Sequence, residues 1–348
     1  SLAAQFTFDA GDDAVAVSAR FLTENRDEAV ALLREALVSP TFEQTAIDRV
    51  RAQVLSSIRS DVTDPNAIAA RTFDARAFGD HPYGSDYQGT VESVSGLTRD
   101  DIVEAFENAL ARDRVYVAAA GDITAEALGS LLDTLLADLP ETGAPLPADV
   151  DVDMTEGVTA VPFDTPQSVA MFGLEGLPRD HPDFFAAYVL NTILGGGGYQ
   201  SRLMEEVREK RGLTYGVYSY LVPKDHAALY MGQVSSANDR IAEAIDVVRD
   251  EWARMARDGV SEEELAAAKT YLTGAYPLRF DGNGRIASIL VGMQMDDLTP
   301  AYVETRNAMV EALTVDEINR VAADLLKPDS LRFVVVGQPE GLDAQPSQ

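Results

Sequence analysis

Two stretches of the chain alternate between hydrophobic and polar residues at every second position, which is typical of half-buried β-strands. They read QFTFDAGDDAVAVSARF (residues 5–21) and TYGVYSYLVPKDHAALYMGQV (residues 214–234), and each predicts a β-hairpin. Segments with helical spacing follow each hairpin, and a run of β-branched or small apolar residues ending at Gly121 or Gly337 then predicts a further strand. A hairpin followed by a block of helices predicts an α+β fold, with a mainly antiparallel sheet and helices packed on one face.

The pattern occurs twice because the sequence repeats itself. A block of 25 residues that starts at Leu97 aligns without a gap with a block 216 residues later, and seven of the positions are identical. Each copy opens with Thr98 or Thr314 and has Asp101 or Glu317 three residues further on, which predicts a capping box at the start of both helices. We therefore expect two homologous halves.

The repeat predicts a first domain over residues 1–145 and a second over residues 152–338. A loose, proline-bearing linker around residues 140–153 joins them, and residues 339–348 are predicted to form a disordered tail. The second half has about 60 residues before its hairpin, 155–213, for which the first half has no counterpart. We infer that the first half lacks its opening strand and helix.

Composition restricts the classes of function. The chain has 46% hydrophobic and 24% charged residues, as expected of a globular protein, and no cysteine, so thiolate metal sites are excluded. Its 57 acidic and 28 basic residues give a net charge of -29, which should repel nucleic acid and anionic membranes. It contains no run of 18 apolar residues, so we expect no membrane span.

Four consecutive glycines do not by themselves predict a phosphate site. The phosphate-binding patterns need a second glycine where Gln200 stands, and they need a strand in front, whereas residues 184–194 have the spacing of a helix. A flexible hinge loop between helices is the simpler interpretation. The hinge glycines are Gly195, Gly196, Gly197 and Gly198.

The histidines do not predict a metal site either. His81, His181 and His226 lie in turn-like segments. No pair of them has the spacing of a helical zinc site. Roles in turns or at the surface are therefore the simpler expectation.

The segment GGGGYQSRLMEEVREKRGLTYGVYSY (residues 195–220), within a duplicated α+β unit, resembles the pitrilysin, or insulinase-type, family of zinc peptidases. The second half of these peptidases has a glycine-rich loop and then a helix carrying R-x-x-x-x-x-x-Y, which here is Arg208 and Tyr215. The resemblance extends over essentially the whole chain, including HPYG at residues 81–84 and AGDI after the expected strand of the first half. It implies that Arg208 and Tyr215 are auxiliary catalytic residues that contact the substrate backbone and the developing oxyanion.

The chemistry of these residues agrees with that role. An arginine offers a rigid fork of N–H donors and a tyrosine offers a hydroxyl, and both suit a carbonyl oxygen that gains negative charge. The alternating strand expected from Tyr215 to Tyr220 could also accept an extended peptide along a sheet edge, which makes Tyr218 and Tyr220 candidate substrate-binding residues.

The sequence departs from the family in its metal ligands. The zinc motif of the family, H-x-x-E-H, does not occur in these 348 residues. The later helix that carries a further zinc-binding glutamate in the family reads DRVRAQVLSSIRSD here, with Ser56 and Ser57 in place of the glutamates. A neutral hydroxyl does not replace a carboxylate that also offsets the charge of zinc. We therefore expect this chain to bind no metal and no other cofactor.

Together these points predict a non-catalytic subunit, inactive alone, that supplies Arg208 and Tyr215 to peptide hydrolysis. Zinc is then expected on a homologous partner subunit, with a self-dimer as the other arrangement. One alternative is a self-sufficient zinc peptidase that has H-x-x-E-H in an N-terminal segment and uses Glu43 or another acid as a ligand. Another is a structural subunit with no peptidase role. The resemblance favours the periplasm, but the sequence does not fix the compartment.

Overall fold

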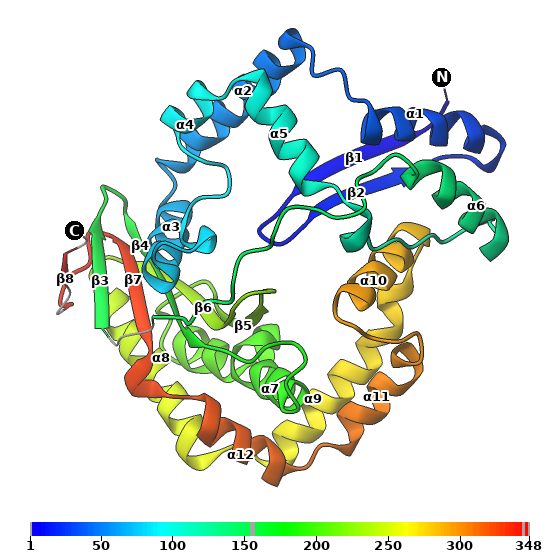
Figure 1. Ribbon diagram of the computed structural model, residues 1–348. Helices are drawn as coiled ribbons and strands as arrows, with labels where there is room; N and C mark the ends of the chain where they lie inside the picture. The colour runs from blue at the N-terminus through cyan, green and yellow to red at the C-terminus, as the bar shows by residue number, and fades with distance from the viewer. Residues whose placement is uncertain (1, 154–156, 343–344, 347–348) are drawn as a thin grey trace. The chain divides into compact units, whose positions relative to one another are not determined.

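The computed structural model describes residues 2–153, 157–342 and 345–346, and the chain forms two compact units (Figure 1). Unit 1 combines residues 1–58, 87–146 and 277–302, and unit 2 combines residues 59–86, 147–276 and 303–348. The units therefore interleave along the chain, whereas the repeat predicted two continuous domains. Residues 59–86 belong to unit 2 because their helix α3 (Pro65–Phe78) packs on its sheet.

The sheet of unit 2 has the strand order β5-β6-β4-β7-β3-β8. All neighbouring pairs are antiparallel except β3 with β7 and β3 with β8, so the predicted α+β class with a mainly antiparallel sheet is confirmed. The second predicted hairpin is β5 and β6, and β5 lies at one end of the order. The strands are β3 (Gly157–Pro162), β4 (Gln167–Glu175), β5 (Val217–Pro223), β6 (Ala228–Ala237), β7 (Arg332–Gly337) and β8 (Gln345–Pro346).

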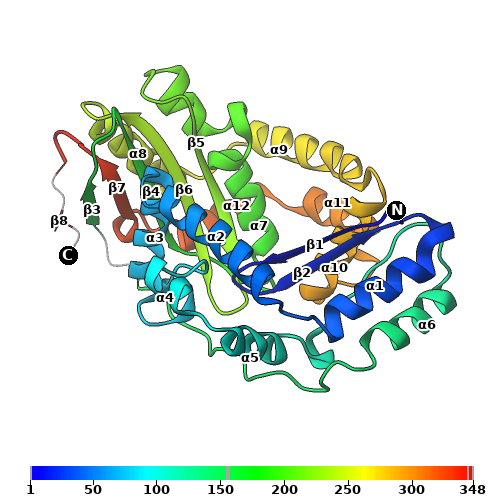
Figure 2. The ribbon, with the colours of Figure 1, turned by 90° about the horizontal axis from the view of Figure 1, so that it is seen from above.

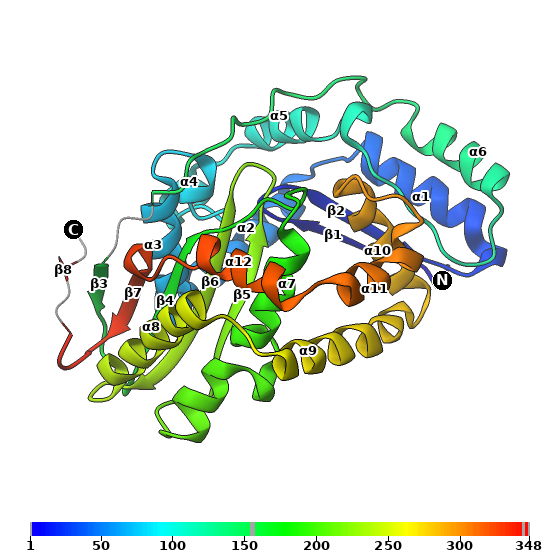
Figure 3. The same ribbon diagram turned by 90° about the horizontal axis from the view of Figure 1, so that it is seen from below.

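Alternating residues of this sheet bury both of its faces. Ala170 and Phe172 of β4 belong to the main core, which helices α7, α8, α9 and α12 cover (Figure 3). Val169 and Met171 point to the opposite face, where α3 covers them with side chains such as Phe73. The helices of unit 2 outside α3 are α7 (Phe184–Asn191), α8 (Ile241–Asp258), α9 (Glu262–Ala275), α11 (Tyr302–Ala312) and α12 (Val315–Leu325).

Unit 1 contains the first predicted hairpin, β1 (Gln5–Ala10) paired with β2 (Val15–Arg20), and a small helical core (Figure 2). That core joins α1 to α6 through leucines such as Leu33 and Leu135. Helix α2 continues three residues past the end of the first segment of this unit. The helices are α1 (Arg26–Val38), α2 (Gln44–Asp61), α4 (Val91–Gly96), α5 (Arg99–Ala109), α6 (Ala125–Leu136) and α10 (Asn283–Met295).

One predicted strand of the first half is missing. Residues 115–120, the counterpart of β7, have an irregular backbone. In unit 2, β7 lies between β3 and β4, which satisfy its backbone N–H and C=O groups on both sides. The strands described in unit 1 are β1 and β2 alone, and they pair with each other. Residues 115–120 form no ladder with either of these strands.

The remaining short elements complete the chain. The predicted disordered tail includes β8, which pairs with Thr159 and Ala160, while residues 343–344 and 347–348 lie outside the described part. None of the described helices is long and apolar enough to cross a membrane. The short helices are η1 (Thr23–Asn25), η2 (Pro82–Gly84), η3 (Arg112–Arg114), η4 (Thr192–Gly196), η5 (Gly198–Gln200), η6 (Met204–Glu209), η7 (Tyr276–Phe280) and η8 (Pro328–Ser330), of which η4 and η6 are π-helical.

Candidate substrate groove

The glycine run lies where a helix end meets the edge strand of unit 2. Helix α7 continues into the π-helix η4, and the chain then turns through η5. A Cβ atom on Gly195 would lie 2.3 Å from Ser219 Oγ and 2.7 Å from its backbone nitrogen, so only glycine permits this approach to β5. Gly198 has a φ of +61°, which reverses the chain before the next helix.

The two middle glycines pack against the helix that precedes them. A Cβ atom on Gly197 would lie 2.5 Å from the carbonyl oxygen of Thr192, and one on Gly196 would lie 2.5 Å from Asn191 Nδ2. Gly197 has a φ of −82°, which other residues adopt readily, so space rather than backbone conformation favours glycine there. Close packing indicates a tight turn at this helix end, and the role of these glycines as a flexible hinge loop stays a prediction.

Arg208 lies on the π-helix η6, which follows the glycine run. Its Nη1 is 3.1 Å from Glu209 Oε1, and its side chain is 31% exposed. Its guanidinium carbon lies 4.8 Å from the ring centroid of Tyr199, within the range of a cation–π contact. Tyr199 was not among the predicted site residues, although it is the aromatic residue that directly follows the four glycines.

Tyr215 precedes β5 by two residues, so it does not begin the strand as predicted. It lies in a bend that the C-terminal end of β6 holds in place. Thr214 Oγ1 donates to the carbonyl oxygen of Ser235 over 2.6 Å, and Ser236 Oγ donates to that of Leu213 over 2.5 Å. The Tyr215 side chain is 88% exposed, so its hydroxyl is open to a ligand.

Tyr218 and Tyr220 form a stacked pair on β5, with ring centroids 6.0 Å apart. The Tyr218 hydroxyl donates to Gln233 Oε1 over 2.9 Å, and Gln233 Nε2 donates to Asn66 Oδ1 over 2.6 Å. Burial raises the pKa of Tyr218, and burial followed by the charges of Tyr218 and Asp74 raises the pKa of Tyr220 to about 12. Both hydroxyls are therefore neutral at physiological pH.

These side chains line one groove of about 420 Å³ beside β5. Tyr215, Tyr218 and Tyr220 all contribute to it, and so does Tyr199, which links Arg208 to the groove without Arg208 itself lining it. Because β5 is the last strand in the order, one of its edges has no partner among the described strands. An unpaired edge beside an aromatic groove is a surface on which an extended peptide can add as a further strand. The lining residues are Gly195, Gly196, Gly198, Tyr199, Met204, Tyr215, Gly216, Val217, Tyr218, Ser219 and Tyr220, so Gly197 is the one hinge glycine that does not line the groove.

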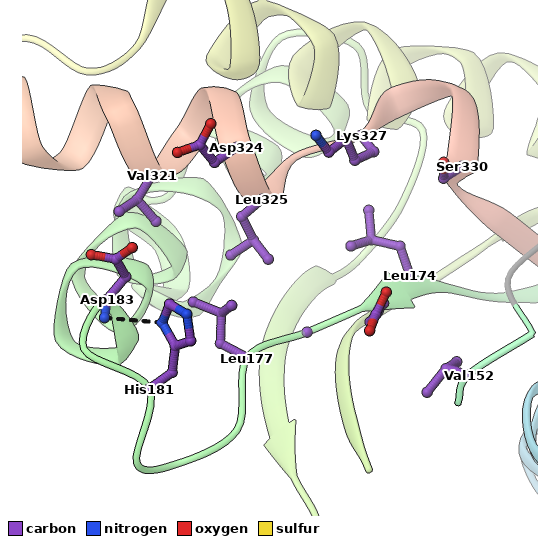
Figure 4. Close-up of a pocket in the computed structure, with 12 residues that line it drawn as sticks. Val152, Leu174, Leu177, His181, Asp183, Val321, Asp324, Leu325, Lys327 and Ser330 are labelled. Atoms are coloured by element: carbon purple, nitrogen blue, oxygen red, sulfur yellow. Dashed lines mark hydrogen bonds between the residues drawn. The ribbon is translucent and has the colours of Figure 1, made fainter. Parts of the chain in front are cut away.

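A second cavity of about 490 Å³ lies at the far end of β4, and His181 lines it (Figure 4). The backbone N–H of Asp183 donates to His181 Nδ1 over 3.1 Å, and the Asp183 carboxylate pairs with Arg320. Asp324 and Lys327 add opposite charges to the same wall. These groups brace the start of α7 against α12, and none of the predicted site residues lies among them.

The residues that the structure describes do not offer a zinc site. No three histidine, aspartate or glutamate side chains within the described ranges converge well enough to hold a metal ion. His81 and His226 approach each other, with ring centroids 6.3 Å apart, but His81 Nε2 is 3.1 Å from the carbonyl oxygen of Ala148 and His226 Nδ1 is 3.1 Å from Asp149 Oδ1. The donor set therefore does not fit zinc.

The positions predicted to correspond to the family's zinc-binding glutamates lie on α2. Ser56 and Ser57 are both exposed there, and each offers only a neutral hydroxyl. Glu43, the alternative ligand, is exposed and directly precedes the helix.

Comparison with known proteins identifies the family. The sequence profile described as "Peptidase M16 inactive domain" matches residues 96–272, which is half of the chain. The chain belongs to the peptidase M16 family. This confirms the resemblance to the pitrilysin-type peptidases that the sequence indicated.

Its M16 relatives have names of two kinds. An uncharacterized zinc protease of Mycobacterium tuberculosis is 31% identical over 303 residues, which are 86% of this chain and 69% of that protein. A non-peptidase homolog of Helicobacter pylori is 25% identical over 336 residues, 94% of this chain and 76% of that protein. The crystal structure of a peptidase M16 inactive domain from Pseudomonas fluorescens superposes with a TM-score of 0.89 at 28% identity, covering 100% of this chain and 83% of that one.

Proposed function

We propose that this M16 chain is a zinc-less subunit that binds extended peptide for hydrolysis by a zinc-bearing homologue. The observation that carries the proposal is the groove beside the unpaired edge of β5, which the exposed Tyr215 lines and where Arg208 lies over the ring of the lining residue Tyr199.

In this role each residue supplies a different kind of contact. The backbone of β5 pairs with the peptide backbone, and the stacked rings of Tyr218 and Tyr220 pack against its side chains. The Tyr215 hydroxyl and the Arg208 guanidinium donate hydrogen bonds to peptide carbonyl oxygens. Donors held in place before the reaction stabilise a carbonyl oxygen most when it gains charge, so they assist turnover as well as binding.

The partner in this proposal is a homologous subunit that carries zinc, or a second copy of this chain in a self-dimer. The M16 relatives include one named a zinc protease and one named a non-peptidase homolog, so both kinds of chain occur within the family. The net charge of -29 favours peptides with basic residues.

The test is peptide hydrolysis by the chain reconstituted with a zinc-bearing M16 protein from the same organism. We expect Arg208→Ala and Tyr215→Phe each to lower kcat/KM by about tenfold or more, since removal of one well-aligned oxyanion-hole donor lowers kcat by about 10²–10³-fold. Tyr271→Phe is the matched control, because Tyr271 is another exposed tyrosine that lies on α9 outside the groove. If the two subunits still assemble and turnover is unchanged with both Arg208→Ala and Tyr215→Phe, the proposal is wrong.

A second candidate function, assembly without a role in hydrolysis, is favoured by the name of the Helicobacter pylori relative. It predicts that the pair hydrolyses peptide at the same rate with Arg208→Ala and Tyr215→Phe combined. Metal analysis of the purified chain tests the zinc-less assignment independently, since about one zinc per chain would contradict it.

A further inference from the structure

The helix that carries Arg208 has a buried carboxylate on its inner side. Glu206 precedes Arg208 by two residues, and its side chain is only 8% exposed. Its Oε1 accepts from Lys210 Nζ over 2.6 Å, and its Oε2 accepts from Arg211 Nη1 over 2.7 Å. The same Arg211 nitrogen also donates to the backbone carbonyl of Glu206 over 2.8 Å. One carboxylate thus holds two of the three cations in the sequence REKR.

Helix α8 supplies a further cation, Arg254, beside the Glu206 carboxylate. Arg254 Nη2 lies 3.6 Å from Glu206 Oε1 and 2.6 Å from Oε2 of Glu251, whose side chain is 7% exposed. Hydrogen bonds from Lys210, opposed by burial and reinforced by Arg211, lower the pKa of Glu206, so it stays ionised. Burial raises the pKa of Glu251, which shares Arg254 with it. An uncompensated charge in this position would be costly, so the cations are held close to Glu206.

The ion pairs of Glu206 with Lys210 and Arg211, here called the clamp, lie in the irregular part of the helix. Residues Met204–Glu209 are π-helical, and the backbone N–H of Lys210 donates to the carbonyl of Glu205 over 2.9 Å. Such π-segments are rare in proteins, and those that do occur are frequently at functional sites. The wider turn of a π-helix alters which side chains share a face, and here Glu206 and Val207 are buried while Arg208 is directed to Tyr199.

We infer that Glu206 is a positioning residue, which holds Lys210 and Arg211 in ion pairs so that Arg208 is the cation presented beside the groove. The inference rests on the proposed function, because it gives Arg208 the ligand contact. Glu209, at 3.1 Å from Arg208, is 58% exposed and therefore fixes the guanidinium less firmly than the buried clamp fixes the helix.

The experiment measures binding of a fluorescein-labelled peptide of alternating valine, threonine and lysine by fluorescence anisotropy, with the intact chain. Such a peptide favours extended conformations and carries the charge opposite to that of the chain. We expect Arg208→Ala to weaken peptide binding about tenfold. We expect Glu206→Gln to weaken it about fivefold, because a small displacement of Arg208 weakens its contact with the peptide. In the Arg208→Ala background, Glu206→Gln should change binding by less than about twofold, because its effect passes through Arg208.

Glu205→Gln is the matched control. Glu205 also pairs with Lys210, at 3.0 Å, but it is 58% exposed, so its substitution removes the same charge without opening the clamp. We expect it to leave binding within about twofold of the parent. Arg211→Gln removes one of the partners of Glu206. Because the Arg211 side chain is 40% exposed, this variant tests the clamp even if the buried substitution Glu206→Gln impairs folding. We expect it to reproduce the loss of peptide binding caused by Glu206→Gln. Fluorescence of Trp252, the single and fully buried tryptophan, reports whether each variant keeps the core.

The outcomes separate the inference from the proposed function. If Arg208→Ala weakens binding but Glu206→Gln and Arg211→Gln do not, Glu206 does not position Arg208, and the proposed function stands. The same conclusion follows if Glu206→Gln costs as much in the Arg208→Ala background as it does alone, since its role is then structural. If Arg208→Ala binds as tightly as the parent, the proposed function itself fails.

Discussion

At the scale of single residues, the ion pair between Arg202 and Glu264 connects the start of the Arg208 helix to α9. Arg202 Nε lies 2.6 Å from Glu264 Oε1 and its Nη2 lies 2.8 Å from Oε2, and both side chains are partly buried. Burial opposes ionisation of Glu264, but hydrogen bonds from Arg202 and Ser261 outweigh it and lower its pKa from 4.5 to about 2. The folded state therefore binds this proton less tightly than the unfolded state does.

We predict that Glu264→Gln lowers the free energy of unfolding by about 1–3 kcal/mol at neutral pH. Because the folded pKa is the lower one, the contribution is fully present above about pH 4.5 and is lost as the pH falls toward about 2. Urea unfolding of parent and variant, compared between about pH 7 and about pH 3, should show their difference shrinking. Glu263→Gln, an exposed neighbour in the same turn, is the control. A difference that is constant over this range would contradict the assignment.

At the scale of elements, the two capping boxes predicted from the repeat are both formed, but the helices they begin differ in burial. Thr98 opens α5, which has no buried residue, whereas Thr314 opens α12, whose side chains enter the main core. We predict that Thr314→Ala lowers the free energy of unfolding by about 1 kcal/mol, measured by Trp252 fluorescence in urea. Thr98→Ala should mainly speed hydrogen exchange in the first turn of α5. Equal shifts of the Trp252 transition would show that burial does not set the cost.

The elements that the sequence predicted correctly are those specified by neighbouring residues. The two hairpins and both caps depend on period-two alternation or on side chains three positions apart, which the sequence displays directly. The placement of α3 on the sheet of unit 2 depends on packing between residues such as Phe73 and Met171, almost 100 positions apart, which no periodicity records. Residues 115–120 have the right composition for a strand, but they form no ladder with the strands described in unit 1.

In the candidate site, too, the sequence predicted the residues that a local motif marks and missed those whose role depends on contacts in the fold. Arg208 and Tyr215 could be singled out because a motif carries them, while the role of Tyr199 depends on a cation–π contact across the glycine turn. The clamp around Glu206 could not be read from the sequence, since Glu205, Glu206 and Glu209 are equivalent there. In the structure, burial and the pairing with both Lys210 and Arg211 distinguish Glu206 from Glu205 and Glu209.

At the scale of the whole molecule, salt should weaken the repulsion between like charges more than it weakens the partly buried ion pairs. The chain carries 57 acidic and 28 basic residues, so repulsion between like charges opposes folding at low ionic strength, whereas pairs such as Arg202–Glu264 are short and partly buried. Screening acts mainly on exposed charges separated by more than a Debye length, which falls from about 20 Å to about 7 Å between about 20 mM and 200 mM NaCl. The repulsive part should therefore be weakened more than the buried pairs.

We predict that the melting temperature rises by a few degrees over this range of NaCl concentration, since a change of about 1 kcal/mol shifts it by about 2–4 °C in domains of this size. Binding of the lysine-bearing peptide should weaken over the same range, because its attraction to the acidic surface is screened. Opposite responses of folding and binding would identify exposed carboxylates as the source of both effects. A melting temperature that falls with salt would mean that the ion pairs around Glu206 and Glu264 outweigh the net charge.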